Sequence, residues 1–214
     1  MSRHTLSLSI AALYCILCLA GVAAAQDSST KAPARGDWYG TLSGNWLVPR
    51  DYDGEGQEWK TYNGWGIYGA LGHRLNESWR AEAEVGYGTV ENDRISVGNS
   101  STLIDGDIHY YSATGALYYD TPSVFSLQPY LGGGAGVVRQ RNERNAVTVG
   151  GRSFPAGDTS TDLTAFAEAG LNVDLGHALE LVPSYRYQWI DDGRDGFDDS
   201  GIHVARIGLR YWFN

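Results

Sequence analysis

Acidic and basic residues alternate with apolar ones along several segments of this 214-residue chain, and charges of both signs held together can do chemistry. Enclosed carboxylates and guanidinium groups could relay a proton or a solute, or they could neutralise one another as buried ion pairs. The residues concerned are Glu82, Glu84, Glu168, Glu180, Arg186, Arg206 and Arg210. The elements that position these side chains decide between the two kinds of chemistry.

Histidines form a second group with chemical potential, because a histidine can act as a general base near neutral pH. His109 and His203 lie toward the ends of two segments that we expect to be β-strands. This placement resembles that of the catalytic histidine in lipid A deacylase barrels, which pair a histidine with a serine two residues further along the same strand face. Tyr111 and Ala205 hold those positions here, although a dyad formed across strands stays open. We therefore predict no catalytic residue, and we keep a lipid-modifying or hydrolytic barrel enzyme as the alternative.

The range 191–199 contains five aspartates and could offer ligands to a cation. Its spacing partly matches a calcium-binding loop, since Asp195 is followed by Gly196. Position three of such a loop is Gly193, however, and Ile202 stands where a bidentate glutamate is needed. We predict a solvated acidic segment here, with no metal and no cofactor.

Eight segments of the chain alternate between two kinds of residue with a period of two. In one of them, Trp79, Ala81 and Ala83 alternate with Arg80 and Glu82. Such alternation indicates β-strands rather than helices, because successive side chains of a strand point to opposite faces. The expected strands cover 38–46, 64–71, 79–87, 111–119, 128–138, 165–174, 179–189 and 206–213.

The two faces of these strands differ in a way that is typical of a membrane barrel. One face carries small apolar residues, with tryptophan and tyrosine near the segment ends, as expected of a lipid-facing wall between aromatic girdles. The other carries glycine, serine and the charges named above. A soluble β-sandwich would instead bury large aliphatic side chains and expose its charges. The sequence predicts an all-β fold, an eight-stranded antiparallel up-and-down transmembrane β-barrel over residues 36–214.

The connections between the expected strands alternate between long and short. The long ones cover 49–60, 89–106, 140–162 and 190–201, and the short ones lie near 75–78, 120–126 and 176–177. Bacterial outer-membrane barrels combine long extracellular loops with short periplasmic turns. We therefore expect the long connections outside the cell and both termini in the periplasm.

The N-terminus has the pattern of a cleaved signal peptide. Arg3 begins a short basic region, an apolar stretch follows over 10–20, and small residues end at Ala25, where we expect cleavage. Both cysteines lie inside this segment and neither follows a small residue, which argues against a lipoprotein. The mature chain would begin with a short polar segment, 26–35, and would have no disulfide.

Charge restricts the partners of the chain. The full sequence has a net charge of −9, and loss of residues 1–25 would remove one basic and no acidic residue. An acidic chain of this kind lacks the basic surface that nucleic acids require. We expect a monomer whose partners are outer-membrane lipid and lipopolysaccharide, the outer-membrane assembly machinery and an unknown extracellular ligand.

Several motifs resemble a known family, the opacity-type surface proteins related to the OmpA and OmpX barrels. The resemblance covers nearly all of the expected mature chain and is carried by the order of the motifs. They are Gly36-Asp37-Trp38-Tyr39, Gly64 to Gly72, Gln128 to Gly136, Phe166 to Leu171, Ser184 to Tyr187 and His203 to Phe213. Tyr211 and Phe213 match the aromatic assembly signal of such barrels, but Asn214 stands at the end, where an aromatic residue is usual.

The resemblance implies a non-enzymatic surface barrel with a role in envelope integrity, adhesion or host interaction, and fold alone does not choose among these. An eight-stranded barrel is only wide enough for its inward side chains to fill it. We therefore expect the seven charged residues to form an ion-pair network that plugs the lumen, which disfavours a narrow small-solute channel.

Overall fold

The computed structural model describes residues 36–49, 52–54, 57–61, 63–97, 100–103, 106–144, 146–149, 152–154, 157, 159–191 and 201–213. The predicted signal peptide, the segment 26–35 and residues 192–200 of the aspartate-rich range lie outside the described residues. Within the described part of the chain, no helix is long and apolar enough to cross a membrane.

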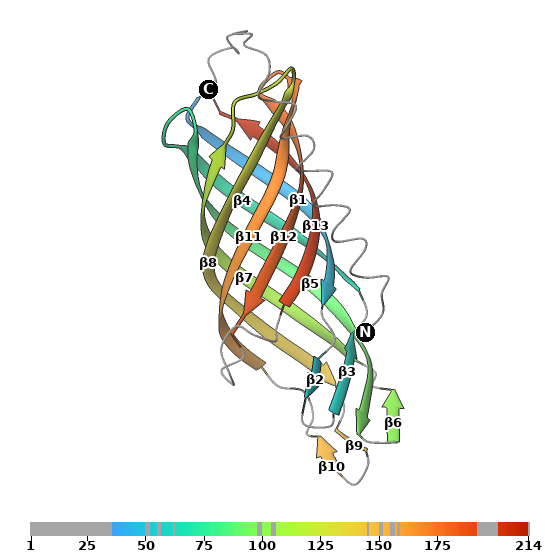
Figure 1. Ribbon diagram of the computed structural model, residues 1–214. Helices are drawn as coiled ribbons and strands as arrows, with labels where there is room; N and C mark the ends of the chain where they lie inside the picture. The colour runs from blue at the N-terminus through green and yellow to red at the C-terminus, as the bar shows by residue number, and fades with distance from the viewer. Residues whose placement is uncertain are drawn as a thin grey trace.

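Eight long strands form a closed antiparallel barrel, as predicted (Figure 1). Each pairs with its neighbours in chain order, and pairing of β13 with β1 closes the ring. Closure leaves no free sheet edge, so backbone groups are satisfied by neighbouring strands. The barrel strands are β1 (Trp38–Pro49), β4 (Gly64–Arg74), β5 (Trp79–Val97), β7 (Gly106–Asp120), β8 (Leu127–Arg144), β11 (Thr159–Gly176), β12 (Leu179–Ile190) and β13 (Gly201–Trp212).

Short connections join strands at one end of the barrel, which we call the turn end. They cover 75–78, 121–126 and 177–178, as the sequence predicted. In the first, the Asn76 side chain accepts hydrogen bonds from the backbone amides of Ser78 and Trp79, a common way to fix a tight turn. The last begins at Gly176, whose φ of 81° lies in the left-handed region that glycine adopts without strain.

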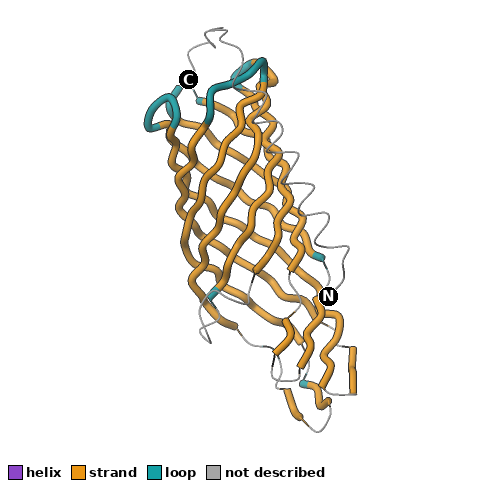
Figure 2. The backbone as a smooth tube through the Cα atoms, in the orientation of Figure 1, coloured by secondary structure: helices purple, strands orange, loops and turns teal. Residues whose placement is uncertain are grey.

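The opposite end, which we call the extension end, differs from the prediction. The ranges 49–60, 89–106 and 140–162 were expected to be loops, but they contain much strand. There β5 continues to Val97 and β8 to Arg144, and short strands pair beyond the barrel (Figures 1 and 2). These are β2 (Tyr52–Gly54), β3 (Gln57–Thr61), β6 (Ser100–Leu103), β9 (Val147–Val149) and β10 (Arg152–Phe154). β3 and β6 pair with β5, β2 pairs with β3, and β9 and β10 pair with each other, so the backbone groups of these polar segments have partners.

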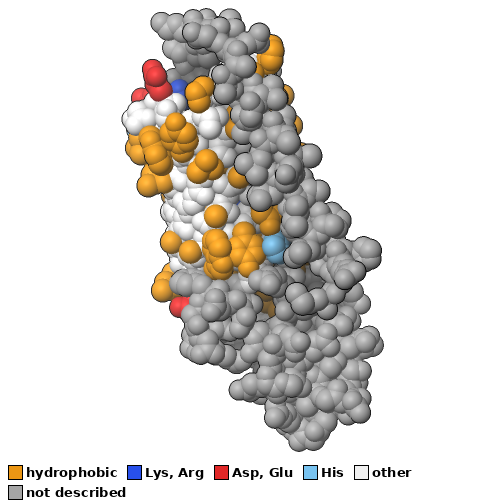
Figure 3. Space-filling model, in the orientation of Figure 1, with side chains coloured by type: hydrophobic (Ala, Val, Ile, Leu, Met, Phe, Trp, Pro, Cys, Tyr) orange, Lys and Arg blue, Asp and Glu red, His pale blue; other side chains and the backbone are white. Residues whose placement is uncertain are grey.

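The wall of the barrel is apolar outside, as the alternation predicted. Leu42, Val85 and Ile207 are exposed, whereas Tyr39, Arg186 and Trp212 on the opposite register are buried. On the face seen in Figure 3, charged side chains gather toward the ends, and hydrophobic and uncharged side chains cover the wall between them. Lipid would cover this wall, since a soluble fold would not leave it exposed.

Candidate functional site

Four charged side chains meet in the middle of the lumen, and we call them the central cluster: Glu84, Glu168, Arg186 and Arg206. Arg186 Nη1 lies 2.6 Å from Glu84 Oε1, and Arg186 Nε lies 2.8 Å from Glu168 Oε2. Arg206 contacts the same two carboxylates, at 2.6 Å and 2.9 Å. Each carboxylate is therefore shared between two guanidinium groups from neighbouring strands, which is the arrangement that buried charges require.

Aromatic side chains surround the central cluster and complete its hydrogen bonds. Tyr130 and Tyr118 donate their hydroxyls to Glu168, at 2.8 Å and 3.3 Å. The guanidinium of Arg186 lies 3.7 Å from the ring centroid of Phe166, close enough for a cation–π interaction. These contacts leave the cluster little freedom to rearrange.

Glycines on neighbouring strands make room for the aromatic rings. A Cβ atom at Gly86 would collide with the ring of Tyr68, and one at Gly72 would collide with Tyr39. These two inward glycines therefore have a packing role, because the rings occupy the space that a side chain there would need.

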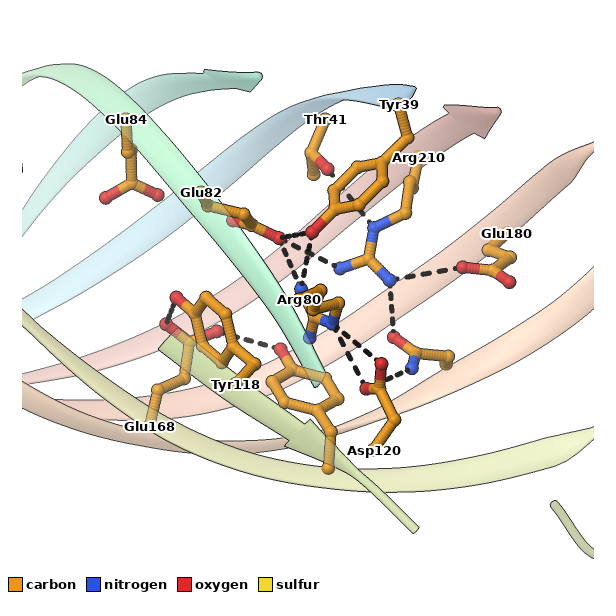
Figure 4. Close-up of polar contacts among 12 residues, drawn as sticks. Tyr39, Thr41, Arg80, Glu82, Glu84, Tyr118, Asp120, Glu168, Glu180 and Arg210 are labelled. Carbon is orange, nitrogen blue, oxygen red and sulfur yellow. Dashed lines mark hydrogen bonds and ion pairs between the residues drawn. The ribbon is translucent and has the colours of Figure 1, made fainter. Parts of the chain in front are cut away.

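A second group of charges, the turn-end cluster, lies nearer the short connections: Arg80, Glu82, Asp120, Glu180 and Arg210 (Figure 4). Arg80 pairs with Glu82, and its Nε lies 3.1 Å from Asp120 Oδ1. Arg210 Nη1 lies 3.1 Å from Glu180 Oε2, and its Nη2 lies 3.4 Å from Glu82 Oε1. Arg80 and Arg210 are almost fully buried.

All seven charged residues singled out in the sequence lie on the inner wall. The structure divides them into two groups, with Glu84, Glu168, Arg186 and Arg206 in one and Glu82, Glu180 and Arg210 in the other. Sequence reasoning missed two members of the turn-end cluster, Arg80 and Asp120. The alternation gave a signal for both, since each has the inward parity of its strand.

The extension end of the lumen has a different character, which the sequence analysis also missed. Six aliphatic side chains fill it, and Tyr110 packs against them. They come from β1, β5, β8, β12 and β13, all on the inward register. We call this group the apolar plug: Leu47, Val90, Val138, Ile190, Ile202 and Val204.

Little empty space remains between the side chains of the two charged clusters. A cavity of about 20 Å³ lies among residues of the two charged clusters, including Arg80, Glu168 and Arg210. That volume holds about one water molecule. Arg80 Nη2 is buried without a hydrogen-bond partner in the described part of the chain, so a water there would have a polar group to bind.

Comparison with known protein families agrees with this architecture. Residues 12–213 match the model of the outer membrane protein β-barrel domain. The chain belongs to the outer membrane β-barrel family. Membership places the protein in a bacterial outer membrane, where lipid covers the apolar outer wall.

Solved structures of other outer membrane barrels share the fold. Neisserial surface protein A has a TM-score of 0.58 and 16% identity, with 84% of this chain and 99% of that one covered. The attachment invasion locus protein Ail of Yersinia pestis, in complex with the heparin analogue sucrose octasulfate, has a TM-score of 0.50 and 19% identity, with 83% and 99% covered. OprG of Pseudomonas aeruginosa has a TM-score of 0.50 and 14% identity, with 84% and 97% covered. A comparison with curated protein sequences finds no match.

Two histidines of this outer membrane barrel lie on the outer wall toward the extension end, each beside a tyrosine. The Tyr87 hydroxyl lies 3.0 Å from His109 Nδ1, and the Tyr185 hydroxyl lies 2.5 Å from His203 Nδ1. A lipase-type dyad requires a serine hydroxyl at this distance, because the serine oxygen is the nucleophile. In the described residues, no group of three or more His, Cys, Asp and Glu side chains could hold a metal ion.

Proposed function

We propose that this protein is a non-enzymatic surface barrel of the bacterial outer membrane. The barrel anchors the chain in lipid, and the strands and connections at the extension end are presented to the outside. Its role belongs to envelope integrity, adhesion or host interaction, through an extracellular ligand that remains to be identified. The protein acts as a monomer and does not bind nucleic acid.

The filled lumen is the observation that carries this proposal. Two layers of buried ion pairs and the apolar plug occupy the interior, and the cavity among the charged side chains has about 20 Å³. A solute channel needs a continuous wet path, which these layers interrupt at three levels. A lumen packed in this way rigidifies the barrel and leaves interaction to the extension end.

The orientation follows from the difference between the two ends. Short turns are typical of the periplasmic side of bacterial barrels, and long connections are typical of the outside. The turn end has the short connections and also Trp38 and Phe213, near the two ends of the barrel sequence. We therefore infer that the termini are periplasmic and that the extension end is extracellular.

The outer wall supports a non-catalytic role. His109 and His203 contact tyrosine hydroxyls, and a phenol in that position is a hydrogen-bond partner rather than a serine-type nucleophile. If the protein were a lipid-modifying enzyme, the refolded protein should release fatty acid from phospholipid or lipopolysaccharide. We expect no release. Release that is lost on substitution of His109 or His203 would show that the protein is an enzyme and would overturn the proposal of a non-enzymatic anchor.

The names of the similar structures are compatible with a surface role. One is called a surface protein and another an attachment invasion protein, which was solved with a heparin analogue. Both likenesses are in fold, so the chemistry of the ligand has to come from experiment.

Surface protease tests the orientation. Added to intact cells, it should cut in the ranges 50–62, 91–105, 145–158 and 192–200 and leave the turns at 75–78 and 177–178 intact. Permeabilised cells provide the control, since both ends are then accessible. Cleavage at 75–78 in intact cells would show that the barrel has the opposite orientation.

Removal of one extension tests the surface role. Replacing residues 145–158, which include the β9–β10 hairpin, with a short glycine–serine linker should leave the barrel folded, because β8 and β11 still pair along their length. Cells that display the two proteins would then be compared for binding to a panel of matrix proteins, sulfated polysaccharides and host cells. We expect binding by the wild type that the shortened protein loses. Absence of any difference in binding, with loss of envelope barrier function when the whole protein is deleted, would favour the envelope role.

Tyr211 and Phe213 are proposed to form the signal for the assembly machinery. Both are exposed on the outer wall at the turn end, with ring centroids 5.9 Å apart. Phe213→Ala should reduce assembly in cells and leave refolding in detergent unchanged, because the side chain does not pack in the lumen. Equal losses in both assays would assign Phe213 to stability instead.

A further inference from the structure

One part of the outer wall departs from the apolar pattern. On β8, Val137 is exposed on the lipid-facing register, and the next two outward positions are Arg139 and Arg141. Across the strand pair, Tyr111 is opposite Arg139 and His109 is opposite Arg141. Arg139 and Arg141 are the only arginine or lysine residues on the outward register among the barrel residues whose side chains are described. We call Arg139, Arg141 and His109 the basic rung.

Aromatic side chains place the basic rung at the boundary of the membrane. The Tyr87 ring lies 5.3 Å from Tyr111 and 6.2 Å from Trp65, so a girdle runs across β4, β5 and β7 at this level. Such girdles occupy the interface where lipid headgroups lie. Because Arg139 is directly opposite Tyr111, its guanidinium can reach the headgroup region while the strand below it contacts acyl chains.

The partners of the three side chains differ. Arg141 Nε lies 3.0 Å from Glu143 Oε1, and both side chains are exposed. Asp107 on β7 is the residue opposite Glu143. Arg139 makes no ion pair within the part of the chain that the structure describes. Among the described residues, His109 makes its hydrogen-bond contact through Nδ1 with the Tyr87 hydroxyl, and its Nε2 has no partner there. A phosphate would satisfy both free groups, since arginine binds phosphate oxygens through parallel hydrogen bonds.

We propose that the basic rung binds the phosphate of an anionic lipid in the membrane that surrounds the barrel. Arg139 is the main contact, and Arg141 and His109 flank it. The lipid source follows from the position of the rung, because the residues below it are apolar and exposed to acyl chains. This inference holds for either orientation of the barrel and does not depend on the proposed extracellular ligand.

Native mass spectrometry of the full protein in neutral detergent tests the proposal. Phosphatidylglycerol would be titrated against phosphatidylcholine, which has a phosphate but no net charge. We expect tighter binding of the first phosphatidylglycerol, weakened about fivefold by Arg139→Gln, since one arginine near an anionic surface contributes about 1 kcal/mol. Arg139→Lys should keep most of the preference, and high salt should remove it. Arg152→Gln, on β10, is the control for the change in net charge.

Several results would overturn the proposal. One is equal affinity of the wild type for the two lipids, and another is a phosphatidylglycerol preference that survives Arg139→Gln combined with Arg141→Gln. Sucrose octasulfate and inorganic phosphate distinguish the source of the anion. If either binds without lipid, depends on Arg139 and displaces no phosphatidylglycerol, the rung recognises a soluble anion instead. Each variant should show the faster migration of a folded barrel on unheated gels, and if Arg139→Gln fails this check, the salt dependence of the wild type and Arg139→Lys decide.

Discussion

The central cluster and the apolar plug occupy the same lumen and come largely from the same strands, yet their chemistry is opposite. In the central cluster, Glu84, Glu168, Arg186 and Arg206 are buried as ion pairs. Only a few residues further along these strands, the inward register carries aliphatic side chains such as Val90 and Val204. The inner wall of this barrel is therefore not uniformly polar.

The outer wall changes in the opposite sense over the same distance. Around the central cluster, the outward positions are apolar, and Val85 and Ile207 are exposed. Around the plug, the outward positions combine the apolar Trp46 and Val48 with the polar residues Thr89, His109 and Arg139. A membrane protein that leaves lipid must again bury its apolar side chains away from water, as a soluble protein does. We infer from this partial exchange of polarity between the two walls that the barrel leaves the bilayer at the level of the plug.

The largest effect is expected when the central cluster loses one partner. Arg186→Leu leaves Glu84 and Glu168 with one guanidinium between them, which should lower the free energy of unfolding by about 3–5 kcal/mol. Denaturant unfolding of the barrel in detergent measures this loss. Removing Glu168 as well should cost less than the sum of the two single losses, because the two residues contact each other.

The exposed pair of Arg141 and Glu143 provides the control for that measurement. Arg141→Leu should lower the free energy of unfolding by less than about 1 kcal/mol, because solvent screens exposed ion pairs. If Arg186→Leu were as stable as the wild type, the central cluster would be hydrated, and the contrast with the plug would disappear.

The apolar plug should respond through lost packing. Leu47→Ala removes buried methyl groups and leaves a cavity, with an expected loss of about 2–4 kcal/mol. Leu47→Met keeps the volume and should cost less than about 1.5 kcal/mol. Unlike the loss in the central cluster, this loss should be insensitive to salt. A Leu47→Ala variant with unchanged stability would mean that the extension end of the lumen is open to water.

A smaller effect is expected from a single hydrogen bond to the central cluster. Tyr130→Phe removes the hydroxyl that donates to Glu168 at 2.8 Å and should cost about 1.5–3 kcal/mol, since the acceptor is charged. Tyr110→Phe, beside the plug, is the matched control and should cost less, because no charged group accepts a hydrogen bond from its hydroxyl in the described part of the chain. Equal losses for the two tyrosines would show that ring packing, and not the bond to Glu168, determines the stability.

The sequence predicted the barrel wall well because a period of two is a local property. The alternation of the neighbouring residues assigned Glu84, Glu168 and Arg186 to the inner face of the barrel. Lipid outside the wall requires this orientation, because charges that face acyl chains are unfavourable. Which inward residues contact one another depends on the stagger between neighbouring strands. The alternation within each strand does not define this stagger. For this reason the sequence analysis did not separate the two charged clusters.

Three features were missed for identifiable reasons. Arg80 and Asp120 have inward parity, but Asp120 ends its strand and had been assigned to a turn. The plug residues also have inward parity, but they lie at the ends of the expected strands or beyond them. The strands of the extension end come from polar segments such as 89–106, whose pairing depends on contacts distant in sequence and leaves a weak local pattern.

The smallest expected signal is the conductance of the barrel in a bilayer. It tests whether the central cluster and the apolar plug each block the lumen independently. In planar bilayers the wild type should carry no steady current, because ion pairs and rings fill the spanning part of the lumen and the plug covers the extension end. Leu47→Ala should also carry none, since the central cluster still closes the path below a damaged plug. Both proteins would be compared with an open porin reconstituted in the same way. Long-lived conductance by the wild type would require a water-filled lumen, and it would show that the protein is a channel and not the proposed anchor. Conductance by Leu47→Ala alone would instead make the plug the seal and leave the central cluster a structural role.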